Sequence, residues 1–183
     1  MHIGLMSLSL RKDSFNTKLL HLAEAVVKDA KIDYHLIDLN QFPLPAFSQD
    51  IEAKGMPDVA DKLKAEMERC TDLIICSPEY NFSYPGHFKN TFDWLSRYTP
   101  MPWRGRNLLL MSASMSLVGG NRGLWHLRVP FEATGTIVYP DMFSLAAAHT
   151  AFEDNGQLKD KVMGERFNGT VRQFLSFIKK LSA

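Results

Sequence analysis

The sequence has few cysteines, no long apolar run and almost no net charge, so it lacks the features typical of secreted, membrane and nucleic-acid-binding proteins. Its two cysteines, Cys70 and Cys76, form no C-x-x-C pair, which favours reduced thiols over a disulfide framework. No apolar run approaches the ~18 residues of a membrane span, and the N-terminal MHIGLMSLSL does not read as a signal peptide. A net charge of +1 creates no strong field toward nucleic acid or an anionic membrane. We therefore expect a cytoplasmic protein with no membrane or nucleic-acid partner.

The histidines likewise show no metal-ligand spacing, so we expect no metal site. Hydrophobic residues make up 45% of the chain and charged residues 22%, which is typical of a folded globular protein. We find no repeat, low-complexity tract or linker that would divide the 183 residues. The expectation is a single domain over residues 1–183.

Short apolar runs alternate with amphipathic segments along the chain, which predicts an α/β protein with a parallel sheet covered by helices on both faces. The third run, LIIC, is solidly apolar, as expected for a strand buried on both sides. The expected strands are 2–6, 33–39, 72–77, 107–112 and 136–139, and the expected helices are 14–30, 57–70, 85–97, 122–134 and 158–181. Two long connections, 40–56 and 140–157, exceed the usual length and are expected to be functional or mobile.

Loops that leave the carboxyl ends of parallel strands share one edge of the sheet, where ligands bind. The first such loop, SLSLRKDSFN (the first rim loop, 7–16), carries hydroxyls, Arg11 and Lys12 just before a helix start near Ser14. Hydroxyls, a guanidinium and free helix N–H groups together suit a phosphate. An ordinary capping segment, with Asp13 or Ser14 as the N-cap, explains the same residues equally well.

The stretch SPEYNFSYPGHFKNTFDWLSR (77–97) begins with a loop that is unusually aromatic, the second rim loop (77–84). Tyr80, Phe82 and Tyr84 offer flat apolar surface, while Asn81 and Ser83 offer hydrogen-bonding groups. A planar heteroaromatic ligand with a polar edge would use both kinds of group. Packing of these rings against another element or a second subunit is the alternative.

The third rim loop, SASMSLVGGNRG (112–123), consists mostly of small residues that let backbone approach a ligand closely, although a flexible turn would look the same. A phosphate at the first loop and a flat ring between the other two describe a mononucleotide. FMN suits this pattern better than AMP, because the glycine fingerprint that would make Asp38 a ribose clamp is absent.

The stretch Pro78–Trp94, PEYNFSYPGHFKNTFDW, resembles a signature of the NAD(P)H-dependent FMN reductases, the flavodoxin-like quinone, azo-compound and chromate reductases. LSLRKDSFN (8–16) resembles the phosphate loop of that family, and the third rim loop resembles its small-residue loop. The resemblance extends over essentially the whole chain. It implies a flavodoxin-like three-layer sandwich with strand order 2-1-3-4-5, FMN as cofactor, and NADPH or NADH as hydride donor.

The resemblance also implies site residues, with no strict catalytic residue because the flavin carries the chemistry. The residues expected to hold the FMN phosphate are Ser9, Arg11, Ser14 and Asn16. Those expected to surround the ribityl chain and ring are Pro78, Glu79, Tyr80, Asn81, Phe82 and Ser83. Those expected on the far side of the ring are Ser112, Ser114, Gly119 and Gly120. It further implies a small-molecule electron acceptor and a homodimer or dimer of dimers, with a partner's aromatic residues near the flavin. We expect Trp94 in the core and Trp103 at a subunit interface.

One departure from the family pattern bears directly on FMN binding. Leu8 stands where the family has glycine, and a backbone with positive φ at this position would strain a leucine. Two functions therefore stay open. The first is an FMN-dependent NAD(P)H oxidoreductase with ping-pong transfer of two electrons to quinone-like or azo acceptors. The second is a flavodoxin-like carrier or binding protein without NAD(P)H turnover, with FMN binding impaired by Leu8.

Overall fold

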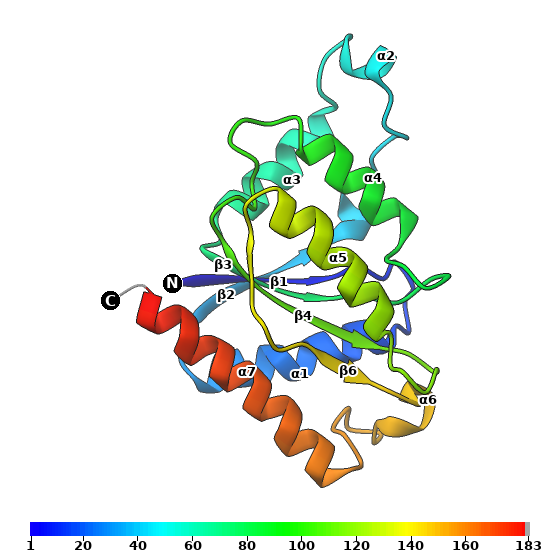
Figure 1. The fold of residues 1–183 in the computed structure, drawn as a ribbon, viewed down its shortest axis with the longest axis vertical. Coiled ribbons are helices and arrows are strands. Elements are labelled where there is room, and N and C mark those ends of the chain that lie inside the picture. The colour runs from blue at the N-terminus through cyan, green and yellow to red at the C-terminus, as the bar shows by residue number, and fades with distance from the viewer. Residues whose placement is uncertain (182–183) are drawn as a thin grey trace.

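The computed structural model describes residues 1–181, in which a parallel β-sheet lies between two layers of helices (Figure 1). The strand order β2-β1-β3-β4-β5 confirms the expected flavodoxin-like arrangement. No helix among the described residues is long and apolar enough to cross a membrane. The strands and helices are β1 His2–Ser7, α1 Phe15–Asp29, β2 Asp33–Asp38, α2 Gln49–Glu52, α3 Asp58–Glu68, β3 Asp72–Cys76, α4 Gly86–Leu95, β4 Asn107–Ala113, α5 Asn121–Ala133, β5 Ile137–Val138, β6 Phe143–Leu145, α6 Ala148–Ala151 and α7 Lys161–Leu181.

A strand that we did not expect, β6, lies within the 140–157 connection. The first residues of β4 pair with β5 and its last residues pair with β6, so β5 and β6 follow the same side of β4 in succession. Pro140 lies between them, and its missing N–H cannot join a ladder. The edge of the sheet is therefore interrupted at the proline and resumes at Phe143.

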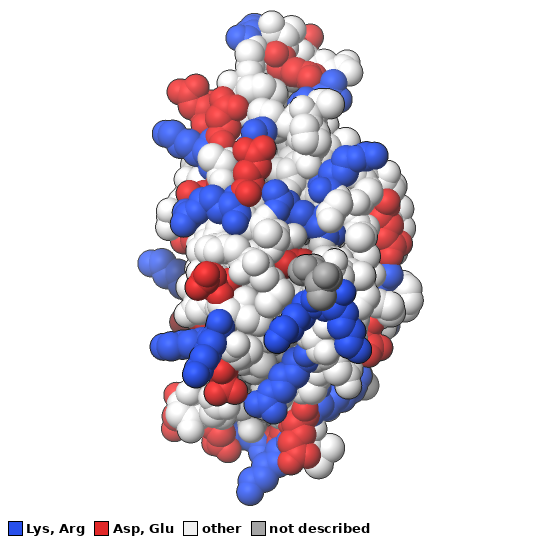
Figure 2. All heavy atoms as spheres, turned by 90° about the vertical axis from the view of Figure 1, so that its left-hand side faces the viewer, with Lys and Arg blue, Asp and Glu red and all other residues white. Residues whose placement is uncertain are grey.

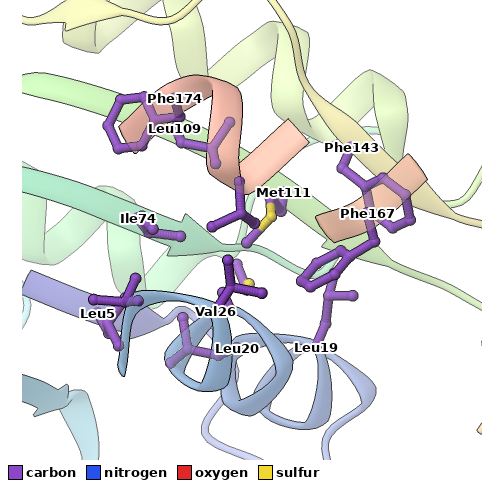
Figure 3. Close-up of a cluster of buried hydrophobic side chains, with 14 of the residues drawn as sticks. Leu5, Leu19, Leu20, Val26, Ile74, Leu109, Met111, Phe143, Phe167 and Phe174 are labelled. Atoms are coloured by element: carbon purple, nitrogen blue, oxygen red, sulfur yellow. The ribbon is translucent and has the colours of Figure 1, made fainter. Parts of the chain in front are cut away.

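The two faces of the sheet carry separate cores. On one face, α1 and α7 pack their apolar sides against β1, β3 and β4, and Figure 3 shows Leu20 of α1 and Phe174 of α7 among these buried side chains. On the other face, α3, α4 and α5 cover the opposite side of the same strands. Because both faces are covered, the central strands are solidly apolar, and the carboxyl edge of the sheet is left for polar loops.

Trp103 belongs to the core and not to a subunit interface, so this expectation was wrong. Its side chain is completely buried, its ring stacks on Phe92 with centroids 4.1 Å apart, and its Nε1 donates to Thr134 Oγ1. Trp94 is buried as expected. The indole of Trp103 lies in a segment without regular structure, which is why helical or strand periodicity gave no sign of its burial.

The 40–56 connection projects from the end of the molecule and carries the short helix α2 at its tip (Figure 1). It is fixed by one side chain of α4 and one just after the helix: Trp94 Nε1 donates to the carbonyl of Pro45 over 2.8 Å, and Arg97 pairs with Glu52 over 2.6 Å. Contacts with a rigid helix therefore hold this long segment in place.

Candidate functional site

The three rim loops meet at the carboxyl edge of the sheet, on the right-hand side of Figure 1. They enclose a hollow of about 370 Å³, which we call the rim hollow. Its lining combines all three loops with the start of α1: Ser9, Arg11, Ser14, Phe15, Asn16, Pro78, Glu79, Tyr80, Ala113, Ser114, Met115 and Ser116. The predicted phosphate residues and the predicted ring residues thus border the same space, although they lie more than 60 positions apart in the sequence.

The first rim loop presents hydroxyl groups and a guanidinium at the start of α1. Ser14 is the N-cap of this helix, and its Oγ accepts hydrogen bonds from the backbone N–H groups of Asn16 and Thr17. Ser9 Oγ accepts from the N–H of Arg11. Both hydroxyl protons remain available as donors, and no acidic residue lies in the first turn of α1 to oppose an anion.

Asn16 joins the first rim loop to the third. Its Nδ2 donates to the carbonyl of Ala113 over 2.9 Å, and its Oδ1 accepts from the N–H of the same residue over 2.9 Å. The side chain is only 3% exposed. These paired bonds fix the end of β4 against the start of α1, and so set the width of the rim hollow at this point.

Leu8 is accommodated without strain. The side chain is fully buried in the core beneath α3, α4 and α5, and the residue is not among those with positive φ. Its backbone N–H donates to the carbonyl of Cys76 over 2.8 Å, which continues the pairing of β1 with β3. The leucine therefore keeps an extended backbone and anchors the first rim loop to the core.

The tip of the second rim loop is a tight turn closed by Tyr80 and Ser83, which exchange two backbone hydrogen bonds of 2.8 and 3.0 Å. Asn81 and Phe82 between them have φ values of 50° and 66°, as in a type I′ turn. A bulky residue rarely adopts this conformation, and such strain clusters at functional sites. The ring of Phe82 is 62% exposed, with the guanidinium of Arg122 at 4.9 Å from its centroid.

Glu79 holds the second rim loop against the start of α5. Its Oε2 accepts a hydrogen bond of 3.0 Å from the backbone N–H of Gly123, and its Oε1 lies 3.8 Å from Arg122. The N-cap residue of α5 is Gly120, which has no side chain to cap the helix. The carboxylate of Glu79, 9% exposed, supplies that cap from another loop.

The third rim loop requires its two glycines for close packing. A Cβ on Gly119, whose φ is 64°, would lie 2.8 Å from the carbonyl carbon of Leu145. A Cβ on Gly120, whose φ is 88°, would lie 3.0 Å from the Cβ of Ser112. Ser112 is itself buried and donates from Oγ to the carbonyl of Gly119 over 2.7 Å. These three residues pack within the loop and do not line the rim hollow, whereas Ser114 does.

The predicted site residues therefore fall into two groups. Eight of them line the rim hollow: Ser9, Arg11, Ser14, Asn16, Pro78, Glu79, Tyr80 and Ser114. The others lie at the turn tip or behind the lining: Asn81, Phe82, Ser83, Ser112, Gly119 and Gly120. The sequence prediction missed Phe15, Ala113, Met115 and Ser116 as lining residues. Their position at or directly after the end of a strand, or at a helix start, was the available signal.

Protonation near the site is governed by burial. Burial lowers the pKa of His87 at the start of α4, with the backbone of Leu8 acting in the opposite sense, and raises the pKa of the Tyr84 phenol. Burial also raises the pKa of the Cys76 thiol at the end of β3. Among the described residues we find no cluster of three or more His, Cys, Asp or Glu side chains that could hold a metal ion. The residues that line the rim hollow thus carry hydroxyls, a guanidinium, a carboxylate, a side-chain amide and aromatic surface.

Comparison with known proteins supports a common family for this architecture. The family model described as NADPH-dependent FMN reductase matches residues 1–150. The chain is 28% identical over 180 residues to a quinone reductase of Escherichia coli strain K12, covering 94% of this chain and 93% of that protein. It is 31% identical over 186 residues to an NADPH:quinone oxidoreductase of Arabidopsis thaliana, covering 99% and 93%.

Solved structures show the same relationship. The flavoenzyme NAD(P)H:(acceptor) oxidoreductase FerB of Paracoccus denitrificans superposes with a TM-score of 0.83 at 28% identity, over 98% of this chain and 97% of that chain. Oxidised flavodoxin 1 of Bacillus cereus superposes with a TM-score of 0.64 at 9% identity, over 96% and 97% of the two chains. The second likeness is one of fold alone.

Proposed function

The chain belongs to the NADPH-dependent FMN reductase family, and on that basis we propose that the rim hollow is its FMN site. The observation that carries the assignment is the meeting of the three rim loops around one space of about 370 Å³, within the usual size of small-molecule pockets. The chain is an NAD(P)H-dependent flavin oxidoreductase. Residues 1–183 act as one FMN-binding domain.

The groups that line the rim hollow suit the two chemically different ends of FMN. The hydroxyls of Ser9 and Ser14, the guanidinium of Arg11 and the N-terminus of α1 provide donors and positive charge for the phosphate. Tyr80 and Met115 provide exposed apolar surface for a flat ring. Asn16 holds the first and third rim loops together by its bonds to Ala113, and so acts as a positioning residue.

Bound FMN would accept a hydride from NADPH or NADH and pass two electrons to an acceptor, in a ping-pong sequence in which donor and acceptor use the same face. The protein's part is to bind, orient and stabilise. We propose that backbone N–H groups of the second and third rim loops stabilise negative charge on the reduced ring. We assign no catalytic acid or base, because no ionisable residue is needed for hydride transfer.

The acceptor that we propose is a small molecule, with quinones first among the candidates because quinone reductases of bacteria and plants are relatives over nearly the full chain. We include azo compounds among the candidates, because they too are reduced by transfer of two electrons at an open flavin face. The unpaired, buried cysteines suit the reducing cytoplasm, which we propose as its location.

We also propose that the chain assembles as a homodimer or a dimer of dimers. Large apolar side chains remain exposed beside the rim hollow and along one side of α5: Phe82, Met115, Leu117, Trp125 and Val129. Such groups beside a site are typical of protein interfaces. Light scattering should report a dimer or tetramer that the double substitution of Trp125 and Val129 by glutamate converts to a monomer. A monomeric wild-type protein would contradict the proposal.

The decisive experiment on function is anaerobic mixing of the FMN-loaded protein with NADPH. We expect the visible absorption of oxidised flavin to disappear and to return on addition of a benzoquinone. If the flavin binds but stays oxidised, the protein is an electron carrier and not a reductase. A protein that binds no FMN at all would contradict the site assignment.

A further inference from the structure

The chain that follows β6 contacts two of the three loops around the rim hollow. We call residues 145–152, from the last residue of β6 through α6 to Phe152, the β6–α6 segment. It lies at the same edge of the sheet as the rim loops, because β6 pairs in parallel with the last residues of β4 (Figure 1). The stretch that matches the family model ends at residue 150, so Phe152 lies just outside it.

Backbone hydrogen bonds join the β6–α6 segment to the third rim loop. The N–H of Ser114 donates to the carbonyl of Leu145 over 3.0 Å, and the carbonyl of Ser114 accepts from the N–H of Ala148 over 3.0 Å. The N–H of Ala147 donates to the carbonyl of Ser116 over 3.3 Å. Ala147 has a φ of 46°, a conformation that persists in a residue with a side chain only where surrounding contacts hold it.

A pair of aromatic rings joins the same segment to the start of α1. The ring of Phe152 stacks on that of Phe15, with centroids 6.3 Å apart and an interplanar angle of 5°. The ammonium group of Lys18 lies 5.9 Å from each of the two centroids. Phe15 lines the rim hollow and packs against the core, so the ring pair restricts the position of a lining residue.

A short hairpin fixes the backbone of Phe152. This residue pairs with Leu158 in an antiparallel bridge, and the N–H of Glu153 donates to the carbonyl of Gln157 over 2.8 Å. Pairing with a returning stretch of chain limits how far the backbone of Phe152 can move. Its ring is therefore a fixed support against which Phe15 packs.

The guanidinium of Arg11 has the ring of Phe15 as its contact, at 5.6 Å from the centroid. No described residue forms a hydrogen bond or an ion pair with this guanidinium. The attraction between a cation and an aromatic face thus holds the side chain. An arginine that is ordered before binding loses less conformational entropy when it takes up a phosphate.

We propose that Phe152 is a positioning residue for the FMN phosphate: it supports Phe15, whose ring holds the guanidinium of Arg11 at the rim hollow. This inference rests on the function proposed above. Phe152 itself does not line the rim hollow. Its effect should therefore fall on the phosphate and not on the flavin ring, and a variant that lacks its side chain keeps the backbone bonds to the third rim loop.

Titration of the flavin-free, full-length protein with FMN and with riboflavin tests the inference. Phe152→Ala should raise the Kd for FMN about fivefold, because Arg11 must then be ordered on binding. The Kd for riboflavin, which lacks the phosphate, should stay the same. With FMN at saturation, kcat with NADPH should also stay the same. Phe152→Tyr keeps the flat ring and should bind FMN like the wild-type protein.

Phe177→Ala is the matched control for loss of a ring. Phe177 of α7 is likewise partly buried against the same core, and its ring lies 5.2 Å from that of Tyr139. It does not line the rim hollow, so its removal should leave both flavin affinities unchanged.

A double substitution shows whether Phe152 acts through Arg11. In a protein that already carries Arg11→Ala, the further change Phe152→Ala should not weaken FMN binding again, because the group that it positions is gone. Additive losses, or equal losses for FMN and riboflavin in Phe152→Ala, would overturn the inference, since a residue that only stabilises the fold would give either result.

Urea unfolding shows whether each variant is folded under the conditions of the titration. Phe152→Leu retains apolar volume without the flat ring, and it replaces the alanine variant if that protein does not fold. It should raise the Kd for FMN about threefold and leave that for riboflavin unchanged. A leucine variant with wild-type affinity for FMN would also overturn the inference.

The two proposals can fail separately. If the wild-type protein binds no FMN, or if Arg11→Ala weakens FMN and riboflavin alike, the site assignment is wrong whatever Phe152 does. If Arg11→Ala weakens FMN alone and Phe152→Ala behaves like Phe177→Ala, the proposed function stands and Phe152 has no part in phosphate binding.

Discussion

The carboxylate of Glu79 accepts a hydrogen bond of 3.0 Å from the backbone N–H of Gly123, 44 residues further along the chain. This single contact joins the loop after β3 to the helix after β4. The Cβ of Glu79 also lies close to where a side chain on Gly120 or Gly123 would begin, so the loops interlock at this point. The spacing between the second and third rim loops, where we place the flavin ring, depends on it.

Replacing Glu79 should separate a hydrogen-bonding role from a role of charge. Glu79→Ala removes the cap of α5 and should lower the free energy of unfolding by about 1–2 kcal/mol and weaken FMN binding. Glu79→Gln keeps an oxygen acceptor and should lose less of both. Urea unfolding and flavin titration measure the two effects. If both variants match the wild-type protein, the contact does not position the loops.

Leu8→Gly should destabilise the protein without tightening FMN. The leucine is fully buried, and truncation of a buried leucine typically costs about 2–5 kcal/mol. Glycine gains nothing in return, because the position has no positive φ. Leu10→Gly in the same loop, where the side chain is 44% exposed, is the matched control and should cost much less. A variant that binds FMN more tightly than the wild-type protein would mean that Leu8 impairs the site.

Arg11→Ala should weaken FMN binding by about 1.5–3 kcal/mol, the usual contribution of a hydrogen bond to a charged group. Titration of the apoprotein with FMN, followed by flavin fluorescence, measures the loss. Riboflavin lacks the phosphate, so its affinity should hardly differ between the two proteins. An equal loss for riboflavin and FMN would place Arg11 away from the phosphate.

The two thiols should be inert in the folded protein at neutral pH. Burial raises the pKa of Cys70 to about 11, against the opposing pull of Arg106 and Arg69, and raises that of Cys76 as well. A thiol reagent at pH 8 should therefore label the native protein slowly and the urea-unfolded protein rapidly. Fast labelling of the native protein would show that neither burial nor protonation protects them.

The same shifts predict how stability responds to alkaline pH. A folded-state pKa above the unfolded value means that the unfolded chain releases its proton first, so stability is complete below about pH 8.5 and falls as the pH rises. For Cys70 the loss should continue up to about pH 11. Cys70→Ala should flatten this part of the profile of unfolding free energy against pH. An equal slope in the variant would assign the effect to other groups.

The regular part of the fold could be predicted because apolar periodicity and the α/β alternation leave few arrangements. The interrupted edge strand could not, since the three residues Phe143–Leu145 carry too short a pattern to distinguish a strand from a loop. The burial of Trp103 was missed for a similar reason. Its partners Phe92 and Thr134 lie on other elements, and only the folded chain brings them together.

The candidate site could be predicted at the level of loops but not of individual contacts. Local sequence left Asp13 or Ser14 as the N-cap of α1, and in the structure the cap is Ser14. It gave no indication that the side-chain amide of Asn16 forms hydrogen bonds with the backbone of Ala113. Nor did it indicate that Gly119 and Gly120 pack against Leu145 and Ser112. Those contacts depend on distances across the sheet edge, and sequence spacing carries no information about them.

The charge distribution agrees with a partner that is a small molecule. Figure 2 shows lysine and arginine interspersed with aspartate and glutamate over the face at the left of Figure 1. That face lies at the amino ends of the strands, away from the rim hollow. Charges of both signs are therefore mixed on that face, and the guanidinium that we propose for the FMN phosphate belongs to the first rim loop.

A crystal structure of the protein with FMN tests most directly whether the rim hollow is the flavin site. We expect the phosphate within hydrogen-bonding distance of Ser9, Arg11 and Ser14, and the ring between Tyr80 and the segment Ser114–Ser116. Flavin bound at any other surface, or a phosphate that contacts none of the first rim loop, would contradict the assignment.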